Sequence, residues 1–288
     1  MTAASSSPVS LPWSVAAAMK QVRTPIGCVL MITAGTGIFM GAHWSPLVPL
    51  MLAFYLVTLL APSAARNSLI WFAIAGAWVA AVMIQPSAME DHVYLYLAWL
   101  VAIAVGLLDR DNFLDEAGRQ GRYLLALLFA TATIWKLTSG SFISGAALWT
   151  SGLLDDRMTP LLNLAGISSE SLADARPQVT AVVASDGETF DISLSSYSSI
   201  ALTLVALGTI ALEALIAVSY AAPDTSRLAK LRAPLLVGFG FVTYAIVPVL
   251  PFALLLAVIG CTIARFERRT VLAFVTMVLV AIVRFATL

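Results

Sequence analysis

Charged residues are scarce in this chain. They make up 11% of its 288 residues, whereas a soluble domain carries about 25%. The 16 basic and 16 acidic residues balance, so there is no basic excess of the kind that binds nucleic acid. The two cysteines, Cys28 and Cys261, lie far apart in apolar stretches, which excludes a paired-cysteine metal or redox motif.

What the chain has instead is apolar surface. Hydrophobic residues make up 60% of it and its mean hydropathy is +0.93, so membrane lipids are the expected solvent and partners. In lipid, every backbone polar group must be satisfied within a helix or a closed barrel. The apolar runs are continuous rather than alternating, which favours helices over barrel strands.

We predict an all-α polytopic membrane protein with about nine transmembrane helices, each near the ~20 residues that cross about 30 Å of hydrocarbon. The predicted spans are 25–42, 46–62, 68–85, 92–108, 121–138, 197–221, 232–247, 249–265 and 270–287. The prolines Pro248 and Pro251 lie between the seventh and eighth predicted spans, which therefore form either a helical hairpin or one kinked helix. Residues 1–24 are predicted as a flexible segment with an interfacial helix, and 25–288 as a single transmembrane domain.

Lysine and arginine concentrate on one side of these spans. If the N-terminus is cytoplasmic, the inner side holds most of the cations, as is usual for membrane proteins. These are Lys20, Arg23, Arg66, Arg110, Arg119, Arg122, Arg227, Lys230, Arg232, Arg265, Arg268 and Arg269. The outer side keeps Arg157, Arg176 and Arg284. We therefore predict a multi-pass cell-membrane protein with a cytoplasmic N-terminus and an extracytoplasmic C-terminus.

One predicted outer loop, 139–196, is much longer than the others. Its first half, Phe142 to Leu164, is apolar at helical spacing, which predicts a re-entrant or surface-lying helix. Its second half alternates β-branched and polar residues around Asp186-Gly187, which predicts a small β-hairpin. We expect this extracytoplasmic insertion to cover the outer ends of the helices or a partner.

Two ionisable residues within the apolar spans are the candidates for chemistry, because buried charge in a membrane is costly. Lys136 lies near the outer end of the fifth span and is a candidate base, since a desolvated amine can give up its proton. The alternative is a lysine that reaches the interface beside Trp135. Glu213 lies deep in the sixth span and is a candidate acid or proton relay. The alternative is a neutral carboxylic acid that bridges helices.

The sequence argues against direct contact between these two residues. With each span centred in the bilayer and a rise of 1.5 Å per residue, Lys136 and Glu213 lie roughly 15 Å apart in depth. A chain of water molecules or a bound polar headgroup would then be needed to connect them. His43 and His92 fall at predicted outer helix ends, where they could shuttle protons or bind a metal together with Glu90 and Asp91. Interfacial histidines without a role are more common, so we expect no metal site there.

The region around Lys136 resembles a known family. Trp135-Lys136-Leu137, followed by Phe142 and Gly145, is similar to a motif of the HTTM family, the membrane domain shared with vitamin K-dependent γ-glutamyl carboxylases. Downstream, the acidic Glu213 and Pro251-Phe252 in a paired helix also fit. The resemblance covers roughly residues 20–270. The chain departs from the family at Phe142, where tryptophan is usual, and near Thr243, where a histidine is usual.

The resemblance implies a role for Lys136 as the base that works with a reduced quinone. Trp135, Phe142, Gly145 and Trp149 are the candidate cofactor-binding residues around it; the cofactor itself is unknown, and a quinone is the possibility. Without the family's large soluble domain, carboxylation of glutamate is not expected.

Three functions follow from these observations. The leading hypothesis is a membrane-embedded enzyme or maturation factor that acts from the outer face on a lipid-soluble, quinone-like substrate or on a membrane-delivered peptide or lipid. The alternative is a non-catalytic subunit that scaffolds a complex with other membrane-protein subunits. A transporter is the third, because Glu213 and the Pro248–Pro251 corner are features that transporters use.

Overall fold

The computed structural model describes residues 23–43, 46–86, 92–184 and 195–287, and every regular element in them is a helix. This confirms the all-helical fold class. The chain forms two compact units that divide between Ala117 and Gly118, within α7 (Phe113–Thr138). The predicted single membrane domain stays a prediction, and the predicted interfacial helix lies outside the described residues.

Each of the nine predicted apolar segments coincides with a helix. In the first unit these are α2 (Pro25–Met40), α3 (Leu47–Leu60), α5 (Ser68–Ile84) and α6 (His92–Gly106). The others are α7 (Phe113–Thr138), α12 (Ser196–Ala221), α13 (Arg232–Ile246), α14 (Leu250–Ile263) and α15 (Arg268–Ala286). The short α4 (Pro62–Ala65) follows α3. Apolar runs bounded by charged or proline-containing loops therefore locate these helices to within a few residues, except at the start of α7.

The predicted count of nine membrane spans is not supported. Among the described residues, three stretches are long and apolar enough to cross a membrane: α12, α15, and Arg227–Ile246, which joins the short η4 (Arg227–Leu231) to α13. The apolar helices α2, α3, α5, α6 and α14 are shorter. The 14 residues of α3 extend about 21 Å, less than the ~30 Å of hydrocarbon.

In the first unit, the polar ends of buried aromatic side chains all find partners among the described residues. The indole nitrogen of Trp99 donates to Thr33 Oγ1 at 3.0 Å, and the Tyr96 hydroxyl donates to the Thr33 carbonyl at 3.1 Å. The indole of Trp71 donates to the Ala65 carbonyl. Because a buried donor without a partner is costly, the two bonds to Thr33 favour the observed packing of α6 on α2, and the Trp71 bond ties α5 to α4.

We expect replacement of Thr33 with valine to lower the free energy of unfolding by about 1–3 kcal/mol, because the Trp99 N–H would stay buried without its acceptor. Unfolding in mixed detergent micelles measures this change. Thr131→Val is the matched control, since the exposed Thr131 hydroxyl bonds only to carbonyls of its own helix. An equal loss of stability in both variants would contradict the expectation.

In the second unit, α13 and α14 are two separate helices. Residues 247–249 interrupt the helical backbone between them, so the single kinked helix is excluded. Both helices pack on α15 and bury Tyr244 and Phe274 between them and their neighbours. Proline explains the break, because Pro248 cannot donate the backbone hydrogen bond that a continuous helix requires there.

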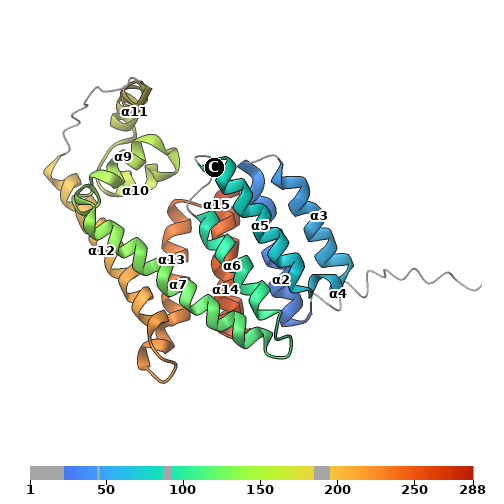
Figure 1. Cartoon of the computed structure of the whole chain (residues 1–288). Helices are drawn as coiled ribbons and strands as arrows, with labels where there is room; N and C mark the ends of the chain where they lie inside the picture. Colours follow the sequence, from blue (N-terminus) through green and yellow to red (C-terminus); the bar gives the residue numbers. More distant parts are fainter. Residues whose placement is uncertain (1–22, 44–45, 87–91, 185–194, 288) are drawn as a thin grey trace, which may run out of the picture. The chain divides into compact units, whose positions relative to one another are not determined.

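The long segment after α7 folds into short helices that gather at one end of α12 (Figure 1). They are α8 (Gly140–Ile143), α9 (Ala146–Leu154), η3 (Asp156–Met158), α10 (Thr159–Leu164) and α11 (Ser169–Ala184). The helix predicted over Phe142–Leu164 is therefore present but broken. These helices and α12 share an apolar cluster of Trp149, Leu153, Leu162, Ala165, Ile167, Leu172, Val179 and Leu202.

Ion pairs hold these short helices together. Arg176 of α11 pairs with Asp156 at 2.7 Å and donates to the Gly152 carbonyl and to the Thr159 hydroxyl. Asp155 accepts hydrogen bonds from the guanidinium of Arg157, and these bonds lower the pKa of the Asp155 carboxyl below its ordinary value. Asp155, Asp156 and Arg157 thus stabilise the turn between α9 and α10.

The predicted β-hairpin is wrong in its first strand. Val179–Ala184 forms the last part of α11, and the predicted turn and second strand lie outside the described residues. Leu172 and Val179 are both buried in the apolar cluster, and their spacing of seven residues is helical. Packing of this helical face outweighs the strand preference of the β-branched residues, which is weak and depends on context.

Candidate functional site

A buried ion pair joins α7 to α12. The ammonium nitrogen of Lys136, in the last turn of α7, donates a hydrogen bond to Oε1 of Glu213, in the middle of α12. The side chains are only 15% and 5% exposed, so most of the pair is removed from solvent. Both candidate residues from the sequence therefore belong to one site.

The predicted separation of Lys136 and Glu213 is wrong, and the reason is the register of the helices. A second ion pair, between Arg122 of α7 and Asp224 just after α12, shows that the two helices run antiparallel. With these two pairs aligned, the first turns of α12 extend past the end of α7 at Thr138. There α12 packs instead on α8 and α9 through Phe142, Ala206 and Ile210. The predicted distance assumed that both spans are centred in the bilayer, and this assumption does not allow α12 to be shifted along α7.

One carboxylate oxygen of Glu213 has no hydrogen-bond partner among the described residues. Oε2 of Glu213 is buried and accepts no hydrogen bond from the residues that the structure describes. A buried carboxylate oxygen without a donor is destabilising. Hence the arrangement has an acceptor for one further hydrogen bond at a place from which bulk water is mostly excluded.

Two of the four predicted cofactor residues lie beside the pair. Lys136 Nζ is 5.2 Å from the centre of the Phe142 ring, close enough for a cation–π interaction. Trp135 contacts the same ring, with the two ring centres 6.2 Å apart. Trp135 is 61% exposed, whereas Phe142 is buried against α12. The aromatic pair thus runs from the surface of α7 to the buried ammonium.

The other two predicted cofactor residues lie elsewhere. Gly145 has φ of +78° and contacts the Leu202–Thr203 backbone so closely that a Cβ atom would come within 2.9 Å of it. Trp149 lies in the apolar cluster with Leu202. Leu202 is about 16 Å along α12 from Glu213. Gly145 and Trp149 therefore pack the short helices on α12, away from the ion pair.

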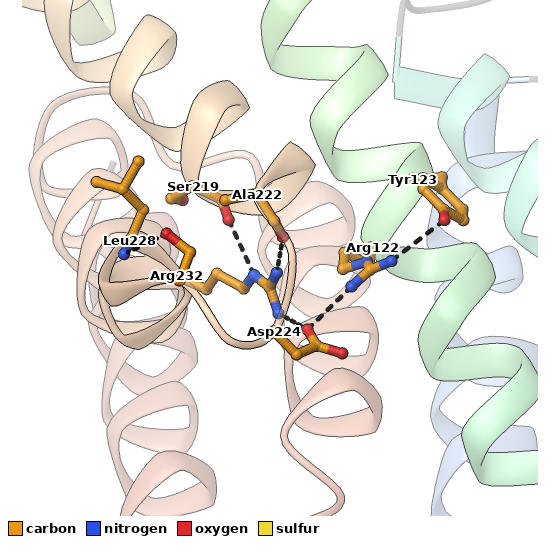
Figure 2. A network of polar contacts seen from close by, with 8 residues as sticks. Arg122, Tyr123, Ser219, Ala222, Asp224, Leu228 and Arg232 are labelled. Carbon is orange, nitrogen blue, oxygen red and sulfur yellow. Dashed lines mark hydrogen bonds and ion pairs between the residues drawn. The ribbon is translucent and has the colours of Figure 1, made fainter.

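Sequence reasoning missed a polar network at the other end of α12 (Figure 2). Arg232 donates to the carbonyls of Ser219 and Ala222, which end α12, and to Oδ1 of Asp224. Arg122 donates to the same Oδ1 at 2.9 Å and also to the Tyr123 hydroxyl. The hydrogen bond from Arg232, with the charge of Arg122, lowers the pKa of the Asp224 carboxyl below its ordinary value.

The charged residues of this network are visible in the sequence. Arg122 and Arg232 were interpreted there only as cations of the inner side, which predict the orientation in the membrane. Asp224 lies three positions after a predicted helix end, in a loop that is otherwise basic, and this was a hint that it pairs with arginine. Only the fold shows that both guanidinium groups reach the same carboxylate.

In the described part of the chain, no three histidine, cysteine or acidic side chains gather as metal ligands. His43 ends a short 3-10 helix and His92 begins α6, each at an end of an apolar helix as predicted. Residues 87–91, which include the two acidic neighbours of His92, lie outside the described residues.

Comparisons with known proteins identify no relative. No family model matches the chain, and neither a curated protein nor a solved structure is similar to it. The resemblance to the HTTM family therefore stays a prediction, and the function must be argued from the site.

Proposed function

We propose that this chain is a multi-pass membrane protein whose Lys136–Glu213 pair binds and deprotonates the hydroxyl group of a lipid-soluble substrate. The observation that carries the proposal is the buried, open Oε2 of Glu213 next to a lysine ammonium. An ion pair between apolar helices is costly to bury, and a purely structural pair would be expected to satisfy both carboxylate oxygens.

The membrane setting is supported by three apolar stretches of sufficient length and by exposed apolar side chains along them. On α15 these include Leu272, Val283 and Phe285, all more than half exposed. The five shorter apolar helices are proposed to enter the bilayer as well. The asymmetric distribution of lysine and arginine supports a cytoplasmic N-terminus, with the short helices α8–α11 proposed to lie outside.

In the proposed reaction, Glu213 and Lys136 have different roles. A substrate hydroxyl donates to Oε2 of Glu213, and the proton passes from the hydroxyl oxygen to Oε2. The ammonium of Lys136 stabilises the negative charge that develops on the substrate oxygen, an effect that is strong where water is excluded. Glu213 is then the proton acceptor, and Lys136 the electrostatic partner rather than the base.

A quinol is the substrate class that we propose. It offers an acidic phenolic hydroxyl for Glu213, and its flat ring suits the aromatic surface of Trp135 and Phe142. Its apolar tail would lie in the lipid. This substrate class also agrees with the quinone that the family resemblance implies.

Binding of a short-chain benzoquinol to the full chain in lipid nanodiscs tests the proposal. We expect saturable binding to the wild type and none to the double variant Lys136→Met/Glu213→Leu. The double variant removes both charges at once, so no buried charge remains unpaired and the fold should persist. Lys230→Met is the control, because Lys230 is exposed in η4 and undergoes the same chemical change.

Equal binding by the wild type and the folded double variant would contradict the proposal. An absence of binding by the wild type, together with obligate co-purification of other membrane subunits, would favour the scaffold alternative. The transporter alternative has less support, because it needs broken helices in paired repeats, and the break between α13 and α14 answers only part of that description.

A further inference from the structure

The network at the end of α12 contains more positive than negative charge. Two guanidinium groups, from Arg122 and Arg232, converge on a single oxygen, Oδ1 of Asp224 (Figure 2). Nε of Arg122 is buried and has no hydrogen-bond partner among the described residues. One carboxylate therefore leaves the two guanidinium groups with a net charge of about +1 and with unused hydrogen-bonding capacity on Arg122.

The exposure of the three side chains is unequal. The arginine side chains are 16% and 11% exposed, whereas Asp224 is 76% exposed. The carboxylate thus lies on the solvent side of two mostly buried cations. Moving Asp224 outward would leave the two guanidinium groups accessible to another anion.

The position of the network agrees with a membrane–water interface. It follows directly after Ala221, where the 26-residue apolar α12 ends. Arg227 and the exposed Lys230 come next, in η4. Lipid phosphates lie at this level of a bilayer, and arginine forms two-point hydrogen bonds with phosphate oxygens.

We propose that Arg122 and Arg232 form a binding site for a phosphate ester group, with the Asp224 carboxylate as an internal substitute that the phosphate displaces. A phosphate offers separate oxygens to the two guanidinium groups, whereas Asp224 gives both the same one. The phosphate comes either from an anionic lipid headgroup or from a soluble phosphate ester. The site rests on the proposed membrane setting but not on the chemistry of Lys136 and Glu213.

The test uses the full chain in a mild detergent, titrated with phosphatidylglycerol, phosphatidylcholine or soluble glycerol phosphate, with the thermal unfolding midpoint as the readout. We expect phosphatidylglycerol to raise the midpoint more than phosphatidylcholine does. Arg122→Gln should weaken the apparent affinity about fivefold, as the loss of one cation near lipid phosphate predicts. Asp224→Asn should strengthen it, because the competing carboxylate is gone.

Arg269→Gln is the matched control, since Arg269 is an exposed cation elsewhere on the proposed inner side and should leave the affinity unchanged. A response to glycerol phosphate as strong as that to phosphatidylglycerol assigns the site to a soluble ester, and a response to the lipid alone assigns it to a headgroup. The proposal is overturned if Arg122→Gln behaves like Arg269→Gln, or if Asp224→Asn folds and binds no more tightly. Should Asp224→Asn not fold, the comparison of the two arginine variants decides.

Discussion

Replacement of Lys136 with methionine is expected to lower the free energy of unfolding by about 3–5 kcal/mol, the cost of leaving a buried charge without its partner. Glu213 would keep one buried carboxylate oxygen that already lacks a donor and lose the hydrogen bond to the other. Unfolding in mixed detergent micelles, with the helical signal as readout, measures the loss.

Replacement of the other partner, Glu213→Leu, should lower the free energy of unfolding by less. The Lys136 side chain is 15% exposed, so its long stem can carry the ammonium toward water, which a glutamate in the middle of α12 cannot do. The double variant Lys136→Met/Glu213→Leu should recover most of the stability that Lys136→Met loses. Additive losses in the two single variants would mean that the side chains do not interact.

Replacement of Gly145 with alanine is the second change with a large expected effect. An alanine at φ of +78° costs about 1–3 kcal/mol in backbone strain. Its Cβ would also approach the Leu202 backbone to 2.9 Å, and such overpacking costs a further ~1–3 kcal/mol. The short helices α8 and α9 should then detach from α12 and exchange their amide hydrogens faster.

Gly140→Ala is the matched control for this prediction. Gly140 begins α8 only a few residues earlier, and no atom lies within 4 Å of the Cβ position there. Alanine should be neutral or slightly stabilising at this site, because it loses less conformational freedom on folding than glycine. Similar exchange rates in both variants would show that the contact between Gly145 and α12 does not hold the short helices.

The helices could be predicted from the sequence because their signals are local. Apolar runs interrupted by charged residues or proline locate α2, α12 and α15 to within a few residues. The hairpin prediction failed because alternating residues fit a strand or a helix, and only the burial of Val179 beside Trp149 decides between them. The count of spans failed because several apolar runs form helices too short to cross hydrocarbon.

The two candidate residues were found from the cost of buried charge, but their pairing was not. Whether Lys136 meets Glu213 depends on how far α12 slides along α7, and neither helix encodes that register in its own sequence. In the fold, Phe142, just after α7, packs on Ala206 and Ile210 of α12, and this contact is compatible with the observed register. Likewise, nothing local in the sequence distinguishes Arg232 and Asp224 from other charged residues near helix ends. Only the fold brings the carbonyls at the end of α12 and the Asp224 carboxylate to the guanidinium of Arg232.

An electron cryomicroscopy map of the full chain in lipid nanodiscs, with the short-chain benzoquinol added, tests the central claim most directly. The proposal predicts Lys136 Nζ within hydrogen-bonding distance of Glu213 and quinol density at Oε2, beside Trp135 and Phe142. Separate positions for the two side chains, or quinol density only elsewhere on the protein, would contradict it.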